Sequence, residues 1–242
     1  MDSANMISEK QFINNFNFFW SSLLPTSSLL IKKINEELYI REYDYLQSSI
    51  VGRRRSLLSY ISFQLFIKAS EKMIELDHFP FDEYKIIEEK YIKQFSELEE
   101  DDPEITDPLI IHEYNEALVL ANRLFSYFSK VQNGSLVINP SFRGCGFINN
   151  CFGDVLVDDT LFEIKMVNRN FRVHDCKQLL TYCALNYASN EYTIKRIALF
   201  NPRNGKITTF NIDEFCLMMS GKSSTVLLGE IIEFISGGGI SR

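Results

Sequence analysis

The sequence predicts a mixed α/β (α+β) fold, in which helices flank a mixed sheet and a helical N-terminal region precedes it. Apolar residues recur at helical spacing from residue 7 to about residue 100. After Pro108 the pattern changes to the order helix, three strands, helix, two strands and helix. Because such a sheet needs helices against it to bury its apolar side chains, this order indicates the fold class.

The composition is typical of a globular protein. The chain has 242 residues, 45% of them hydrophobic, which is enough for one large domain or two small ones. No apolar run reaches membrane-spanning length, and Asp2 and Glu9 differ from the basic start of a signal peptide. We therefore expect a cytoplasmic protein without a membrane association, whose five cysteines are reduced thiols.

Two features of the helical front each permit two interpretations. An aromatic stripe over residues 16–20 is interpreted as core, with a base-stacking platform as the alternative. The basic run Arg53, Arg54 and Arg55 fits contact with phosphate as well as the exposed start of a helix.

A boundary between two parts of the chain is expected at Glu97–Pro108. This segment is acidic, contains two prolines and has little apolar content, which is typical of a solvated loop. Residues 1–107 are accordingly expected to form a helical region that packs on the core. Residues 108–242 are expected to form that core together with its C-terminal helices.

The elements of the second half follow from local patterns. Leu109–Lys130 carries apolar residues at helical spacing and predicts a helix. Asp158-Asp159-Thr160 supplies turn residues between two short apolar runs and predicts a hairpin. The expected elements after the first helix are strands over Phe142–Asn149, within Gly153–Val157 and over Leu161–Val167, a helix within Phe171–Ala188, strands over Ile194–Phe200 and Ile207–Ile212, and helices over Asp213–Ser220 and Thr225–Ile235.

The hairpin brings charged residues together. Side chains alternate across a strand, so Glu163 and Lys165 share one face of the second strand, and Asp154 starts the first. Two carboxylates bind a hard divalent cation through oxygen. A lysine beside them supplies a fixed positive charge where negative charge develops on phosphate or hydroxide.

Asp154 followed by Glu163-x-Lys165 resembles the motif of the PD-(D/E)xK nuclease superfamily. Gln178 and Tyr182 lie four residues apart on one helix face, similar to the QxxxY motif of the RecB-type exonuclease branch. The resemblance covers roughly residues 139–210. Gly153 stands where the motif's name has proline.

This resemblance implies a restriction-endonuclease-like sheet and a site that uses Mg²⁺ or Mn²⁺. Asp154, Glu163, Lys165, Gln178 and Tyr182 would be the catalytic residues. The metal ligands that the resemblance implies are Asp154, Glu163, the Ile164 carbonyl and a glutamate of the preceding helix, for which Glu116 is expected, with Glu113 or an ordinary solvated helix face as alternatives.

The charge distribution agrees with a nucleic-acid substrate. The chain has a net charge of −7, yet eight basic residues and only two acidic ones lie between Lys165 and Lys206. Such a basic stretch can hold a phosphate backbone. Arg169, Arg172 and Lys177 are the residues expected to bind nucleic acid.

The function expected from these features is metal-dependent hydrolysis of DNA, with bacterial or phage defence as its context. Alternatives are an inactive nuclease-fold module that binds nucleic acid or a protein, and an RNase or transposon-type endonuclease subunit. A protein partner or a homo-oligomer fits each of them. The sequence has no nucleotide-binding loop, so no nucleotide cofactor of its own is expected, and its cysteine spacing lacks a C-x-x-C pair.

Overall fold

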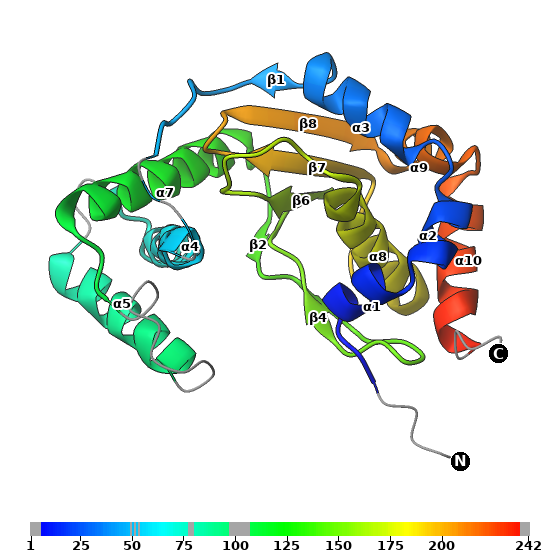
Figure 1. Ribbon diagram of the computed structural model, residues 1–242, viewed down its shortest axis with the longest axis horizontal. Helices are drawn as coiled ribbons and strands as arrows, with labels where there is room; N and C mark the ends of the chain where they lie inside the picture. Colours follow the sequence, from blue (N-terminus) through cyan, green and yellow to red (C-terminus); the bar gives the residue numbers. More distant parts are fainter. Residues whose placement is uncertain are drawn as a thin grey trace.

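The computed structural model describes residues 6–48, 50, 52, 54–76, 80–96 and 107–237. Within these residues the chain forms nine helices, a mixed six-stranded sheet and a separate two-stranded sheet, which confirms the mixed α/β class. Figure 1 shows the large sheet between two groups of helices. Most of the expected boundary segment, residues 97–106, lies outside the described residues, as does Arg53.

The large sheet has the order β1-β8-β7-β6-β5-β2. Only the central pair, β6 and β7, runs parallel, and its other neighbours are antiparallel. A parallel pair needs a crossover connection, and α8 (Val173–Ser189) supplies it between β6 and β7. In sheet order the strands are β1 (Ile40–Arg41), β8 (Lys206–Asn211), β7 (Arg196–Asn201), β6 (Thr160–Ile164), β5 (Val155–Val157) and β2 (Leu136–Ile138).

The predicted hairpin is present as β5 and β6. Its turn contains Asp158 in the left-handed region at φ 52°, and the Asp158 carboxylate accepts the backbone N–H groups of Asn133 and Ser135. This side chain therefore ties the turn between α7 (Ile111–Val131) and β2 to the hairpin. β6 ends at Ile164, three residues before the expected end at Val167.

On one face of the sheet lies α8, and five further helices share one buried core with it. Phe12 and Trp20 are fully buried there together with Leu161 of β6, so the aromatic stripe contributes to the core. Phe18 is 88% exposed and is the exception within the stripe. The five further helices are α1 (Glu9–Asn15), α2 (Asn17–Leu23), α3 (Ser27–Glu36), α9 (Ile212–Ser220) and α10 (Ser224–Ser236).

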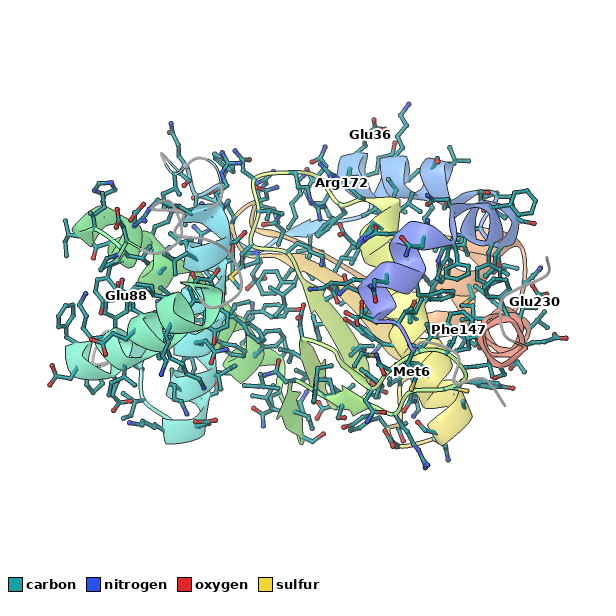
Figure 2. The ribbon with its side chains drawn as sticks, turned by 60° about the horizontal axis from the view of Figure 1, so that its bottom comes forward. Met6, Glu36, Glu88, Phe147, Arg172 and Glu230 are labelled. Carbon is teal, nitrogen blue, oxygen red and sulfur yellow. The ribbon has the colours of Figure 1, made fainter. Side chains whose placement is uncertain are left out.

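On the opposite face, α7 and α4 (Arg54–Lys72) share a second core with the sheet, and α5 (Phe81–Ser96) packs against α4. Phe162 and Ile164 of β6 share this second core with Phe128 of α7. Figures 1 and 2 show the α5 end of the molecule, which carries Glu88, far from the α10 end, which carries Glu230.

Residues 1–107 therefore do not form one helical unit. The helices α1–α3 belong to the core on one side of the sheet, and α4 and α5 belong to the core on the other side. Between them β1 pairs with β8 at the sheet edge through Ile40 and Ile207. The expected helical N-terminal region is present in the described residues, and β1 is a two-residue strand within it.

The prediction of a strand over Phe142–Asn149 is wrong. Only β3 (Ser141–Phe142) is extended, and it pairs with β4 (Cys151–Phe152). The segment between them is a loop, in which Gly146 takes a positive φ of 56°. The loop packs against the end of α10 and pairs with Ile7, and Figure 2 shows Met6 beside Phe147 at this contact.

No single helix within the described residues is long and apolar enough to cross a membrane. The helices α9 and α10 meet the requirement only as a pair bent by 69°. Phe215, Leu227 and Ile231 of this pair are buried in the core.

Candidate active site

The hairpin places two carboxylates beside the start of α8. Because side chains alternate along β6, Leu161 packs on the α8 side and Phe162 on the α7 side, so Glu163 faces α8. Asp154 precedes β5, and its Oδ2 accepts the Ile164 backbone N–H at 2.7 Å. The carboxylate of Asp154 is thereby fixed next to the residue that follows Glu163.

Lys165 connects this pair to α8. Its Nζ donates to Glu163 Oε1 at 2.5 Å and to Gln178 Oε1 at 3.0 Å. Gln178 Nε2 in turn donates to the Tyr182 hydroxyl at 2.8 Å. The structure thus brings the two sequence motifs into one hydrogen-bonded chain from Glu163 to Tyr182.

Packing against Phe142 explains why position 153 is a glycine. A Cβ on Gly153 would lie 3.0 Å from the Phe142 ring, closer than the ring tolerates without a shift. The same ring stacks on Tyr182, with centroids 5.3 Å apart and planes at 12°. Glycine before Asp154 therefore leaves room for the Phe142 ring, which stacks on Tyr182.

Burial decides the charge state of the two carboxylates. Desolvation raises the pKa of Asp154, against the attraction of Lys165 and the Ile164 N–H. Desolvation, reinforced by the charge of Asp154, raises the pKa of Glu163 to about 8 even though Lys165 opposes this shift. Burial also works against the charged form of Lys165, but the surrounding carboxylates outweigh it and its pKa rises. Burial thus favours the protonated forms of the two carboxylates, and a bound cation would favour their ionised forms instead.

We predict that Glu163→Gln makes the metal-free protein more stable at pH 8 than the wild type. The folded-state pKa of Glu163, about 8, lies above its ordinary value of 4.5, so the folded state holds a proton that the unfolded state has released. Stability is therefore lost as pH rises through this window, by up to about 1.4 kcal/mol per pH unit. Urea unfolding in EDTA at pH 5, 6, 7 and 8 measures the difference, and parallel profiles for the two proteins would contradict it.

The donor set fits a hard divalent cation in part. Glu163 Oε2 is buried and lacks a hydrogen-bond partner among the described residues, and a metal ion would satisfy it. The described residues contain no group of three or more His, Cys, Asp and Glu side chains placed to hold a metal. Mg²⁺ commonly takes only one or two protein carboxylates and fills its remaining positions with water and substrate oxygen. Asp154 and Glu163 therefore suffice as protein carboxylates for it.

Glu116 and Glu113 are not brought to these carboxylates. Both lie on α7, on the opposite face of the sheet from Glu163. Glu116 forms an ion pair with Arg203 at 2.5 Å, and Glu113 accepts Arg54 Nε at 2.6 Å. The expected fourth ligand from the preceding helix is thus engaged elsewhere.

The three residues expected to bind nucleic acid differ in their surroundings. Arg169 donates to both carboxylate oxygens of Asp175, at 2.7 and 2.8 Å. Lys177 lies over the Trp20 ring at 5.6 Å, and burial lowers its pKa. Arg172 is exposed, and Figure 2 shows it near Glu36 on one side of the molecule.

Several residues of the site carry no obvious sequence signal. Lys10 of α1 is exposed, and its charge acts on Asp154 to lower that carboxyl's pKa. Asp175 is fully buried beside Lys165, and only its place three residues into α8 marks it. The turn between β7 and β8 holds the loop after β6, because Asn201 and Asn204 donate to the Arg169 carbonyl.

We predict that Arg172→Ala and Lys10→Ala each reduce the log–log salt slope of duplex DNA binding by about 0.9, the value of one phosphate contact. Both cations are exposed, whereas Arg169 is engaged by Asp175. Fluorescence anisotropy at several salt concentrations measures the slope. Lys90→Ala on α5 is the matched control, since Lys90 is an exposed cation on the other side of the sheet. A slope unchanged in both variants would place the DNA elsewhere.

Comparison with known proteins adds no family to this geometry. The nuclease resemblance therefore depends on Asp154, Glu163, Lys165, Gln178 and Tyr182, which the fold brings together. The chain matches no family model, no curated protein and no solved structure.

Proposed function

We propose that the protein is a Mg²⁺- or Mn²⁺-dependent phosphodiesterase of the PD-(D/E)xK type that hydrolyses DNA. One observation carries the proposal: the Lys165 ammonium links Glu163 to Gln178 and Tyr182 on the sheet face that also bears Asp154. A helical or strand surface that serves only stability gains little from a cluster of buried charges. Perturbed carboxylates with a lysine between them are typical of a catalytic centre.

A restriction-endonuclease-like core is part of this proposal. Supporting it are the mixed sheet, the parallel pair β6 and β7, and α8 as the crossover between them. Functional residues of open sheets gather at the carboxyl ends of strands. Glu163 and Lys165 lie at that end of β6, next to the start of α8.

Each residue has a role that follows from its contacts. Asp154 and Glu163 would hold the metal, which supplies Lewis-acid activation of a water molecule. An ammonium has three N–H donors, and Lys165 uses two of them on Glu163 and Gln178. Its third donor can stabilise charge that develops on the phosphate. Gln178 holds Lys165, and Tyr182 fixes Gln178 in turn.

A cleavage assay tests the function directly. The full-length protein is incubated with linear duplex, circular duplex and single-stranded DNA and with RNA, in Mg²⁺, in Mn²⁺ and in EDTA. We expect metal-dependent cleavage of DNA. Cleavage confined to RNA would replace the substrate, and DNA binding without cleavage in any metal would favour the inactive-module alternative.

We predict that Asp154→Ala loses both cleavage and divalent-metal binding. It removes one of the two carboxylates available to the cation, and it also removes the acceptor of the Ile164 N–H. Titration calorimetry with Mn²⁺ measures the affinity. Asp159→Ala is the control, because Asp159 lies in the turn of the same hairpin but forms an ion pair with the exposed Arg196. Unchanged Mn²⁺ affinity in Asp154→Ala would mean that the metal binds elsewhere.

A further inference from the structure

A third carboxylate, Asp175, is built into the start of α8 beyond the residues used so far. It is fully buried. Its Oδ1 accepts a hydrogen bond from Arg169 Nη2 at 2.8 Å, and its Oδ2 accepts hydrogen bonds from Arg169 Nη1 at 2.7 Å and from the Arg172 backbone N–H at 2.9 Å. Burial alone would raise its pKa, but these contacts and the charge of Lys165 outweigh burial and hold it below the ordinary value. Asp175 is therefore an anion in the folded protein.

Asp175 also faces the ammonium of Lys165. Its Oδ1 lies 3.9 Å from Lys165 Nζ, too far for a hydrogen bond but close enough for a strong attraction at a buried position. Glu163 and Gln178 take two of the ammonium's donors. Asp175 thus draws Lys165 towards α8 without occupying its third donor.

The same carboxylate controls where Arg169 lies. Arg169 follows β6 on a loop, and its carbonyl accepts side-chain N–H groups of Asn201 and Asn204. Arg169 Nη2 and Lys165 Nζ approach the same oxygen of Asp175, Oδ1. Without this shared anion, two like charges would lie close together in a partly buried site, where their repulsion is strong.

We infer that Asp175 is a positioning residue of the active site, which fixes the Lys165 ammonium against Glu163 and Gln178 and holds Arg169 to one side. The inference rests on the proposed nuclease function for its effect on rate. Its alternative is a purely structural role, in which Asp175 only caps α8 and pairs with Arg169. The two roles make different predictions for a variant in which the ion pair is removed from both sides.

Two variants and one control separate these roles. Asp175→Asn keeps an oxygen for the Arg172 N–H but leaves Arg169 without its anion. The double variant Arg169→Gln, Asp175→Asn removes both charges, so that no unpaired charge remains and stability recovers. Asp159→Asn is the matched control, since it breaks the exposed Asp159–Arg196 pair of the same sheet.

Single-turnover DNA cleavage, Mn²⁺ affinity and thermal unfolding are measured on all of them. We expect Asp175→Asn and the double variant to cleave about tenfold to a hundredfold more slowly than wild type, as displacement of a catalytic group does, with Mn²⁺ affinity unchanged. The control keeps the wild-type rate. A double variant that regains the rate together with its stability overturns the positioning role.

A readout without cleavage keeps this test separate from the proposed function. In protein labelled with ¹⁵N-lysine, the Lys165 ammonium signal is identified by its loss in Lys165→Arg. We expect a signal protected from solvent exchange in wild type and in Asp159→Asn, and its loss in both Asp175 variants. A protected signal that persists without Asp175 overturns the inference. Absence of cleavage by wild type on every substrate overturns the nuclease proposal instead.

Discussion

Replacement of Lys165 by alanine is expected to slow DNA cleavage by roughly 10²–10³-fold, the range found when one donor to a developing oxyanion is removed. Lys165 is the cation that touches Glu163 and Gln178 at once. Its third N–H is the donor proposed to act on the phosphate as negative charge develops there. Interactions stronger in the transition state than in the ground state raise the rate, so the loss is expected in kcat rather than in DNA affinity.

The same substitution also affects the folded state, because it leaves the buried Glu163 carboxylate without its cation. Glu163 and Asp175 both lie near the ammonium, and removing one partner of a buried ion pair costs about 3–5 kcal/mol. Part of this cost is avoided for Glu163, whose pKa is already raised to about 8 and which can take up a proton. Folding of the variant must therefore be verified by thermal unfolding before rates are compared.

Single-turnover cleavage in Mn²⁺ measures the effect, and Lys195→Ala is the matched control. Lys195 is an exposed lysine just before β7, so its removal changes the net charge by the same amount without touching Glu163. Wild-type cleavage by folded Lys165→Ala would exclude Lys165 from the chemistry. Loss of cleavage in both variants would point to net charge as the cause.

The hairpin and α8 could be predicted from the sequence because each depends on local pattern. Asp158 supplies the left-handed turn, and the alternation along β6 places Glu163 on one face. Gln178 and Tyr182 meet because residues four apart on a helix are neighbours, and their hydrogen bond of 2.8 Å confirms the expected shared face.

Pairings between distant charges could not be predicted in this way. Glu116 has the helical position expected of a metal ligand, yet α7 packs on the other sheet face and Glu116 pairs with Arg203. Arg169 has the basic character expected of a DNA contact, yet it is bound to Asp175. Which face of the sheet a helix covers is decided by the whole core, and no local spacing contains that information.

Short elements with distant partners were missed for a similar reason. The strand β1 consists of Ile40 and Arg41 and exists through its pairing with Ile207 and Lys206. Conversely, the apolar residues of Phe142–Asn149 suggested a strand, but this segment turns to pack on α10 and on Ile7. Contacts with segments far away in the sequence decided both outcomes.

A chain truncated to begin at Asp107 is expected not to fold. It loses α1–α3 from one face of the sheet, α4 and α5 from the other, and the edge strand β1. Phe12, Trp20 and Ile34 are each fully buried in the core shared with α8. Burial of each side chain contributes about 1.5–3 kcal/mol. The three together are therefore comparable to the free energy of unfolding of a typical protein, which is about 5–15 kcal/mol. Circular dichroism and thermal unfolding of the purified fragment measure the loss.

Two neighbouring aromatic residues isolate the cause. Trp20→Ala is expected to destabilise the full chain by about 3–5 kcal/mol, as other large-to-small substitutions in cores do. Phe18→Ala is the matched control, because Phe18 lies two residues earlier and is 88% exposed. It is expected to change stability by less than about 0.5 kcal/mol. Equal effects of the two substitutions would contradict the burial of Trp20 in the core shared with α8.

The truncation also decides whether chemistry belongs wholly to the second half of the chain. The fragment keeps the five proposed catalytic residues, Asp154, Glu163, Lys165, Gln178 and Tyr182. It loses helix α1, whose Lys10 carries a charge that lowers the pKa of Asp154. A fragment that unfolds cooperatively and still nicks DNA with Mn²⁺ would show that the front half only selects the substrate. A fragment that stays unfolded, while full-length Lys10→Ala folds and binds DNA more weakly, would show that the first helix serves both the core and the site.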